Sequence, residues 1–127
     1  MPEKARLIEI VEKYRPLGVT KGGLLLIPPQ VAIRMIHDVA EAGFVIVGLD
    51  GWGSYIKKDG AERIYESLEV DFAVSRDTLD GHNPVSESAA ACEAYIRSIP
   101  DSLKSEAVYI SLVIDYPREW ADEIFPI

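Results

Sequence analysis

The sequence predicts an α+β protein: an antiparallel sheet of about four strands packed with three helices, in a single domain over residues 1–127. Three segments repeat apolar residues every three or four positions, as amphipathic helices do. Other segments are apolar throughout or alternate between apolar and polar residues, as strands do. Asp59-Gly60 separates two of these and is a strong hairpin signal, so the strands are expected to be antiparallel.

The first helix is expected over residues 3–15. Its predicted buried face comprises Leu7, Ile10, Val11 and Tyr14. Pro16 and Gly18 end it, and residues 17–23 are expected to form a short flexible connection. The apolar run 24–27 fits either a short strand or the approach to the next helix.

The second helix is expected to open at Pro28-Pro29, because proline is tolerated in a first helical turn. Its predicted buried face comprises Ala32, Met35, Ile36 and Val39, and its outer face Arg34, His37, Asp38 and Glu41. Gly43 stands where a left-handed cap ends a helix.

Residues 44–49 are apolar on both faces and predict a central strand. Strands are then expected over 55–57 and 62–73, on either side of the hairpin. In the second of these, Tyr65, Glu69 and Asp71 share one face. Residues 75–84 are dense in turn formers and are expected to be a loop.

The third helix is expected over 85–98, with Ser86 or Ser88 capping its N-terminus and Pro100 ending the segment. Its predicted buried face comprises Ala89, Cys92, Ile96 and Ile99. A final strand is expected over 107–114, followed by a tail rich in aromatic and acidic residues.

The chain carries 21 acidic and 13 basic side chains, a formal net charge of −8. This charge repels phosphate backbones and steers basic proteins, so we expect a protein partner and no nucleic acid. No apolar run approaches the roughly 18 residues of a membrane span, and the first residues do not resemble a secretory signal. We therefore expect a cytoplasmic protein without membrane contact.

Residue types that could carry chemistry are few. A single cysteine, Cys92, excludes an internal disulfide and favours a buried thiol. His37 and His82 lack the spacing of a metal motif, and no nucleophile elbow or phosphate loop occurs. We therefore expect neither catalysis, nor a metal, nor a cofactor. The enzyme or ligand-binding alternative stays open, with His82, Asp80 and Asp50 as its candidates.

One family resemblance covers about residues 24–98. The order of the helix AIRMIHDVAEAG, the strand FVIVGLD, the KKDG hairpin and the helix SAAACEAYIRS resembles the immunity protein 40 family of bacterial polymorphic toxin systems. The resemblance implies a small cytoplasmic protein that neutralises a toxin, encoded beside it, by direct binding.

The leading interpretation is thus an immunity-type protein that binds a basic toxin domain through an acidic, aromatic surface. Trp52, in a glycine-rich turn, is of the type enriched at interfaces. The expected contact residues are Asp50, Trp52, Tyr55, Tyr65, Glu69, Asp71, Asp77 and Asp80. The alternative is a regulatory or scaffold domain that binds another protein or forms a homodimer. An edge strand and an aromatic tail with Trp120, Phe125 and Ile127 would support such self-association.

Overall fold

The computed structural model describes residues 2–21, 23–56, 62–66, 72–73, 84–98 and 108–125. Its α-helices are α1 (Pro2–Tyr14), α2 (Pro29–Glu41), α3 (Pro84–Ser98) and the short α5 (Ala121–Ile124). Its strands are β1 (Val19–Lys21), β2 (Leu24–Leu26), β3 (Ile46–Ile56), β4 (Glu62–Glu66), β5 (Phe72–Ala73) and β6 (Val108–Ile114). Two 3-10 turns, Arg15–Leu17 and Arg118–Trp120, extend α1 and precede α5. The predicted α+β class is confirmed.

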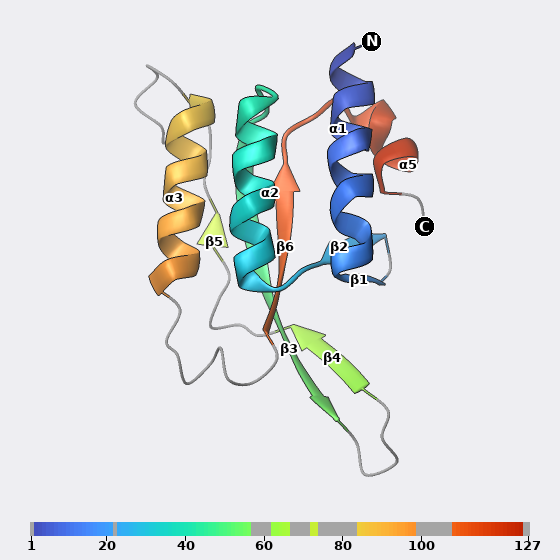
Figure 1. The fold of residues 1–127 in the computed structure, drawn as a ribbon, viewed down its shortest axis with the longest axis vertical. Coiled ribbons are helices and arrows are strands. Elements are labelled where there is room, and N and C mark those ends of the chain that lie inside the picture. Colours follow the sequence, from blue (N-terminus) through green and yellow to red (C-terminus); the bar gives the residue numbers. More distant parts are fainter. Residues whose placement is uncertain are drawn as a thin grey trace.

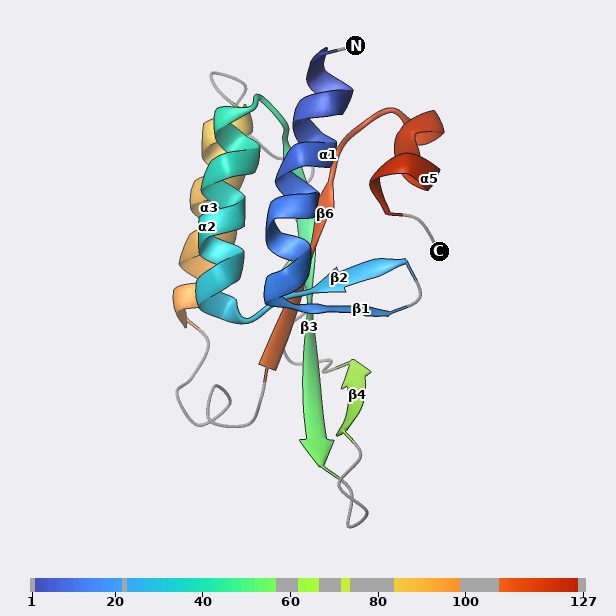
Figure 2. The same cartoon turned by 45° about the vertical axis from the view of Figure 1, so that its right-hand side comes forward.

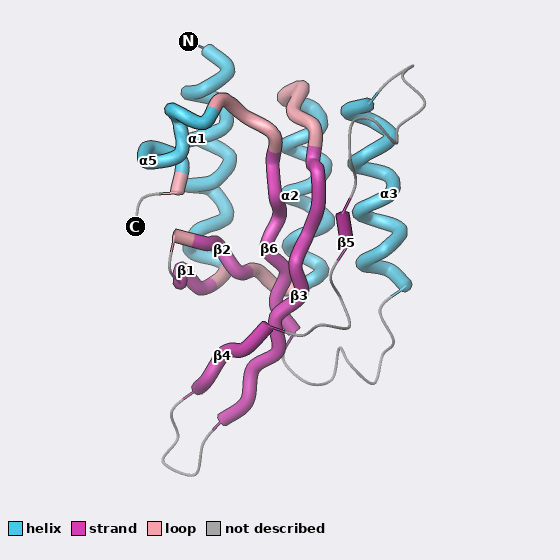
Figure 3. The backbone as a smooth tube through the Cα atoms, turned by 180° about the vertical axis from the view of Figure 1, so that it is seen from behind, coloured by secondary structure: helices cyan, strands magenta, loops and turns pink. Residues whose placement is uncertain are grey.

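The long helices form one layer and the strands form another. Helices α1, α2 and α3 stand side by side against one face of the sheet (Figure 1), and the view from behind has β3 and β6 in front of them (Figure 3). The core between the layers contains, from the helices, Leu7, Ile10, Val11, Tyr14, Ala32, Met35, Ile36, Val39, Ala89, Cys92 and Ile96. The buried faces predicted for these helices are therefore confirmed wherever the structure describes their residues.

Strand β3 organises the larger sheet. It pairs antiparallel with β6 along one edge and with β4 and β5 along the other. A register shift between Ile46 and Gly48 inserts one extra residue, Val47, opposite β6. The bulge resets the alternation of side chains, so Ile46 and Leu49 are both buried in the core.

The expected sheet of about four strands corresponds only to this part of the fold, because β1 and β2 form a second, two-stranded antiparallel sheet. Residues 19–21, expected to belong to a flexible connection, are strand β1. The hairpin is anchored where Ile27 and Ile110 exchange backbone hydrogen bonds of 2.9 and 2.7 Å. Ile27 and Ile110 are far apart in the sequence, so the local residue pattern could not predict this bridge.

The end of α2 is as predicted. Gly43 adopts a positive φ of 91°, the left-handed region in which glycine is favoured. Its N–H donates to the carbonyl of Ala40 at 2.9 Å, and the N–H of Phe44 donates to Val39 at 3.1 Å. These bonds satisfy carbonyls that the last helical turn would otherwise leave unpaired and turn the chain into the sheet.

The N-terminal cap predicted for α3 needs correction. The helix begins at Pro84, so Ser88 lies inside it and is fully buried. The Ser88 hydroxyl donates to the Val85 carbonyl at 3.1 Å and accepts the Ile46 N–H at 3.2 Å. Ser88 thus joins the third helix to the start of β3, beside the bulge, because a buried N–H there needs an acceptor.

The C-terminal tail also differs from its predicted form. It continues into α5, a further helix that lies beside α1 (Figure 2) and that the sequence did not predict. Trp120 is buried and packs edge-on against Phe44, with ring centroids 6.3 Å apart. Phe125 packs against Tyr116 at a centroid distance of 6.3 Å. These rings are occupied within the chain, which removes the basis for assigning self-association to Trp120.

Candidate functional site

Half of the predicted contact residues lie on described strands. Asp50, Trp52 and Tyr55 are in β3, and Tyr65 is in β4. The others lie outside the described residues: Glu69, Asp71, Asp77 and Asp80. The part of the predicted surface that the structure places is therefore a two-stranded ribbon made by β3 and β4.

The strand register divides these four positions between two faces. Asp50 and Trp52 are two residues apart on β3, opposite Ser111 and Tyr109 of β6. Tyr65 is opposite Gly53, and Tyr55 is two residues further along β3, so these two positions belong to the alternate set. One predicted surface thus becomes two pairs of positions, and a partner that meets all four has to contact both faces.

The ribbon extends past the helix layer. β4 pairs with residues 52–56 of β3, and this half of β3 lies beyond the ends of α2 and α3 (Figures 1 and 2). Among the described residues, no helix covers either face of this part of the sheet (Figures 1 and 3). The three aromatic positions of the predicted surface, Trp52, Tyr55 and Tyr65, all lie in this projecting part.

The rest of the sheet has one face turned away from the long helices (Figure 3). Asp50 is half-buried there, at the register position opposite the buried Ser111. Val113, two residues further along β6, is 44% exposed. Of the eight predicted contact residues, Asp50 is the only one whose side-chain burial the structure describes.

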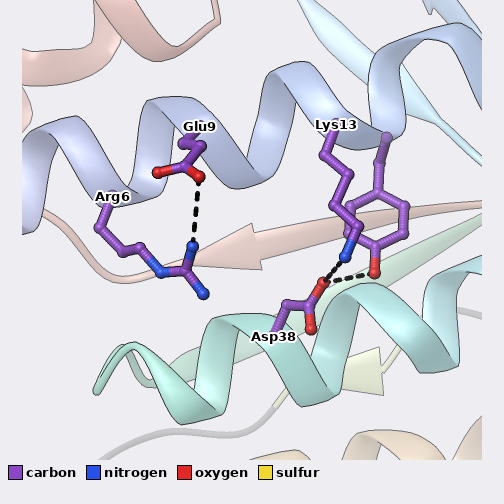
Figure 4. Close-up of polar contacts among 5 residues, drawn as sticks. Arg6, Glu9, Lys13 and Asp38 are labelled. Carbon is purple, nitrogen blue, oxygen red and sulfur yellow. Dashed lines mark hydrogen bonds and ion pairs between the residues drawn. The ribbon is translucent and has the colours of Figure 1, made fainter.

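A polar cluster joins α1 to α2 on the helix layer. The Tyr14 hydroxyl donates to the Asp38 Oδ2 at 2.5 Å, and the Lys13 ammonium donates to the same oxygen at 2.9 Å (Figure 4). Burial raises the pKa of the Asp38 carboxyl, but the hydrogen bonds from Tyr14 and Lys13 outweigh it, so this pKa lies below its usual value. Burial and the bond to Asp38 raise the pKa of Tyr14. Asp38, predicted to face outward, therefore joins two helices.

Asp38→Asn is expected to lower the free energy of unfolding by about 1 kcal/mol near neutral pH, since it weakens charge-assisted hydrogen bonds. Because the folded state lowers the pKa of Asp38, its contribution is present above the unfolded pKa of about 3.9. It is lost as the pH falls through the lower, folded pKa. Urea unfolding at about five pH values between 2 and 7 covers the range in which a carboxyl titrates. It measures the difference in the free energy of unfolding between Asp38→Asn and the wild type.

The matched control is Glu41→Gln, an exposed acid one turn further along α2. This variant is expected to follow the wild type at every pH, because exposed charges contribute little to stability. A constant difference between Asp38→Asn and wild type down to the lowest pH would contradict the assignment of the pH-dependent part to the Asp38 carboxylate.

His37 has a structural contact. Its Nε2 lies 3.2 Å from Glu93 Oε1 of α3, and Arg97 Nη2 lies 3.0 Å from the same oxygen. The bonds from Arg97 and from His37 lower the pKa of the Glu93 carboxyl. Glu93 was not among the residues predicted from the sequence, although its spacing of four residues from Arg97 indicates a helical ion pair. His82 and Asp80, the other candidates for an enzyme site, lie outside the described residues.

Cys92 is fully buried in α3, as predicted. Burial raises the pKa of its thiol to about 11, so the thiolate is scarce near neutral pH. Since the thiolate is the reactive form of cysteine, Cys92 is a core residue rather than a nucleophile.

Within the described part of the chain, His, Cys, Asp and Glu side chains form no group of three or more that could hold a metal ion. None of the described helices has the length and apolar character needed to cross a membrane. Comparison of the protein with family models, with curated proteins and with solved structures finds no match.

Proposed function

We propose that the protein is an immunity-type inhibitor of the bacterial cytoplasm, which binds a partner toxin and neutralises it by covering its surface, with no chemical step of its own. The observation that supports this best is the ribbon of β3 and β4, which carries the Trp52, Tyr55 and Tyr65 positions past the helix layer. Tryptophan and tyrosine are the residues most enriched among those that dominate binding energy at protein interfaces.

Charge supports a basic partner. The chain has a net charge of −8, and Asp50 adjoins the aromatic positions on β3. A negative surface attracts a basic protein at long range, speeds association and makes it sensitive to salt. The resemblance of residues 24–98 to the immunity protein 40 family points to the same class of partner, a toxin domain encoded beside the inhibitor.

The test is to co-express the chain with the protein encoded next to it and to measure both co-purification and cell survival. Trp52→Ala and Tyr65→Ala are each expected to weaken the complex by about 30-fold, the effect of losing a dominant interface residue. Tyr95→Ala is the control, since Tyr95 is a half-buried tyrosine of α3 and belongs to neither strand of the ribbon. Thermal unfolding of each variant establishes that it folds.

Two results would overturn the proposal. The first is that cells producing the neighbouring protein grow equally well with and without this chain. The second is a complex that the ribbon variants leave unchanged while Tyr95→Ala weakens it, which would move the interface to α3. A salt-insensitive complex would instead remove the assignment of a basic partner.

A further inference from the structure

Beyond one short anchor, the backbone on the outer edge of β6 has no hydrogen-bond partner among the described residues. Ile110 exchanges both backbone hydrogen bonds with Ile27 on this edge, and Asp115 donates to the Val45 carbonyl at 2.8 Å on the other side. Peptide groups alternate in direction along a strand, so those of Leu112 and Ile114 face the same way as those of Ile110. Among the described residues, neither has a backbone partner on that side.

The pairing of the hairpin with β6 ends at the Ile27–Ile110 bridge because β2 turns away from β6. Leu24, Leu25 and Leu26 pair with β1 instead of continuing along β6. A cleft of about 300 Å³ opens next to the free edge. Its walls are the hairpin residues Gly23, Leu24 and Leu25, the strand residues Ser111, Leu112, Val113 and Ile114, and the C-terminal residues Tyr116, Ala121, Asp122 and Phe125. In Figure 2 the hairpin and α5 both project on one side of β6 and bracket this edge.

The cleft wall is apolar and partly uncovered. Leu24 is 41% exposed and Val113 is 44% exposed, and with Leu17 they are the large apolar side chains most exposed among the described residues. Among the described residues of the wall, Asp122 is the single charged side chain, and it is exposed. The cleft therefore combines unpaired strand backbone, apolar side chains and one carboxylate.

We propose that this cleft binds an extended, apolar peptide segment of a protein partner, which adds to the outer edge of β6 as a further strand and places a basic side chain against Asp122. Added strands gain affinity from backbone hydrogen bonds, here with Leu112 and Ile114, and specificity from side-chain pockets, here beside Leu24, Val113 and Phe125. The site lies on the edge of the sheet opposite β4, so the inference does not depend on the proposed function.

A second copy of the chain fits the cleft less well. Two copies would bring net charges of −8 together, and like charges oppose association. The hairpin and α5 project on the same side of β6 (Figure 2), and a single extended segment needs less room between them than a folded domain does. The carboxylate of Asp122 complements a basic residue and not another acidic surface.

The test uses a phage-displayed library of random nine-residue peptides (about the length of a long strand) and the full chain as bait. Enriched peptides are expected to alternate apolar with polar residues and to carry a lysine or arginine. Nuclear magnetic resonance titration with the best synthetic peptide should then shift the amide signals of Leu112 and Ile114. Methylating alternate backbone nitrogens of that peptide removes its edge hydrogen bonds and should abolish binding.

Val113→Lys is expected to weaken peptide binding by about tenfold. The new lysine repels the basic residue of the peptide, and the apolar contact of Val113 is lost. Its matched control is Leu17→Lys, because Leu17 is 45% exposed and lies outside the cleft wall. Asp122→Asn should weaken binding about threefold and reduce its salt dependence. Thermal unfolding is compared for all three variants.

The proposal is overturned if no peptide is enriched, or if Val113→Lys and Leu17→Lys bind the selected peptide equally. It is also overturned if sedimentation shows a wild-type dimer that Val113→Lys dissociates, since the edge would then pair with a second copy. Enriched peptides that bind as helices, judged by circular dichroism, would likewise exclude strand addition.

Discussion

Replacing Trp120 with alanine is expected to lower the free energy of unfolding by about 3–5 kcal/mol, the usual cost of removing a large aromatic side chain from a core. Trp120 is only 8% exposed, and its ring meets the ring of Phe44 at an interplanar angle of 75°. The substitution leaves a cavity between the start of the sheet and the C-terminal helix. Chemical denaturation followed by circular dichroism measures the loss.

Trp120→Phe is the matched control, because it keeps an aromatic ring facing Phe44 and should cost much less. Sedimentation of the same proteins distinguishes this role from the tail interpretation drawn from the sequence. A contact between copies through Trp120 predicts that Trp120→Ala dissociates a dimer with little change in stability. That result would contradict the intramolecular packing of Trp120.

Gly18→Ala is expected to destabilise the protein by about 3 kcal/mol, at the upper end of the cost of overpacking. A Cβ atom at Gly18 would lie 2.2 Å from the Leu26 carbonyl oxygen and 2.7 Å from Ile27 Cγ2. The first of these is backbone and cannot rotate away, so the hairpin must move. Because Ile27 anchors the hairpin to Ile110, the change should disturb that bridge as well.

The contrasting variant is Gly43→Ala. Here a Cβ meets nothing within 4 Å, but φ is +91°, so the cost is conformational and about 1 kcal/mol. Amide hydrogen exchange separates the two causes: Gly18→Ala should speed exchange at Ile110, and Gly43→Ala should leave it unchanged. Faster exchange at Ile110 in both variants, or in neither, would contradict the close approach of Gly18 to Leu26.

The candidate sites show where residue pattern stops being informative. One hairpin has three aromatic residues near it, Trp52, Tyr55 and Tyr65. The sequence predicted that they belong to a single surface. Their register positions belong to two faces, because β3 and β4 pair with Gly53 opposite Tyr65. The free edge of β6 was not anticipated either, since it depends on β2 turning away from β6 after one bridge.

By itself the sequence determined the α+β class, the buried faces of the three long helices and the stop at Gly43. These features depend on the spacing of residues within a few positions, which side-chain periodicity and backbone preference record directly. Only the tertiary structure decided the role of Ser88 as acceptor for Ile46, the burial of Trp120 and the unpaired backbone that the described residues leave at the β6 edge. Each of these depends on contact between segments far apart in the chain, and the energy of such a contact is absent from the local pattern of either segment.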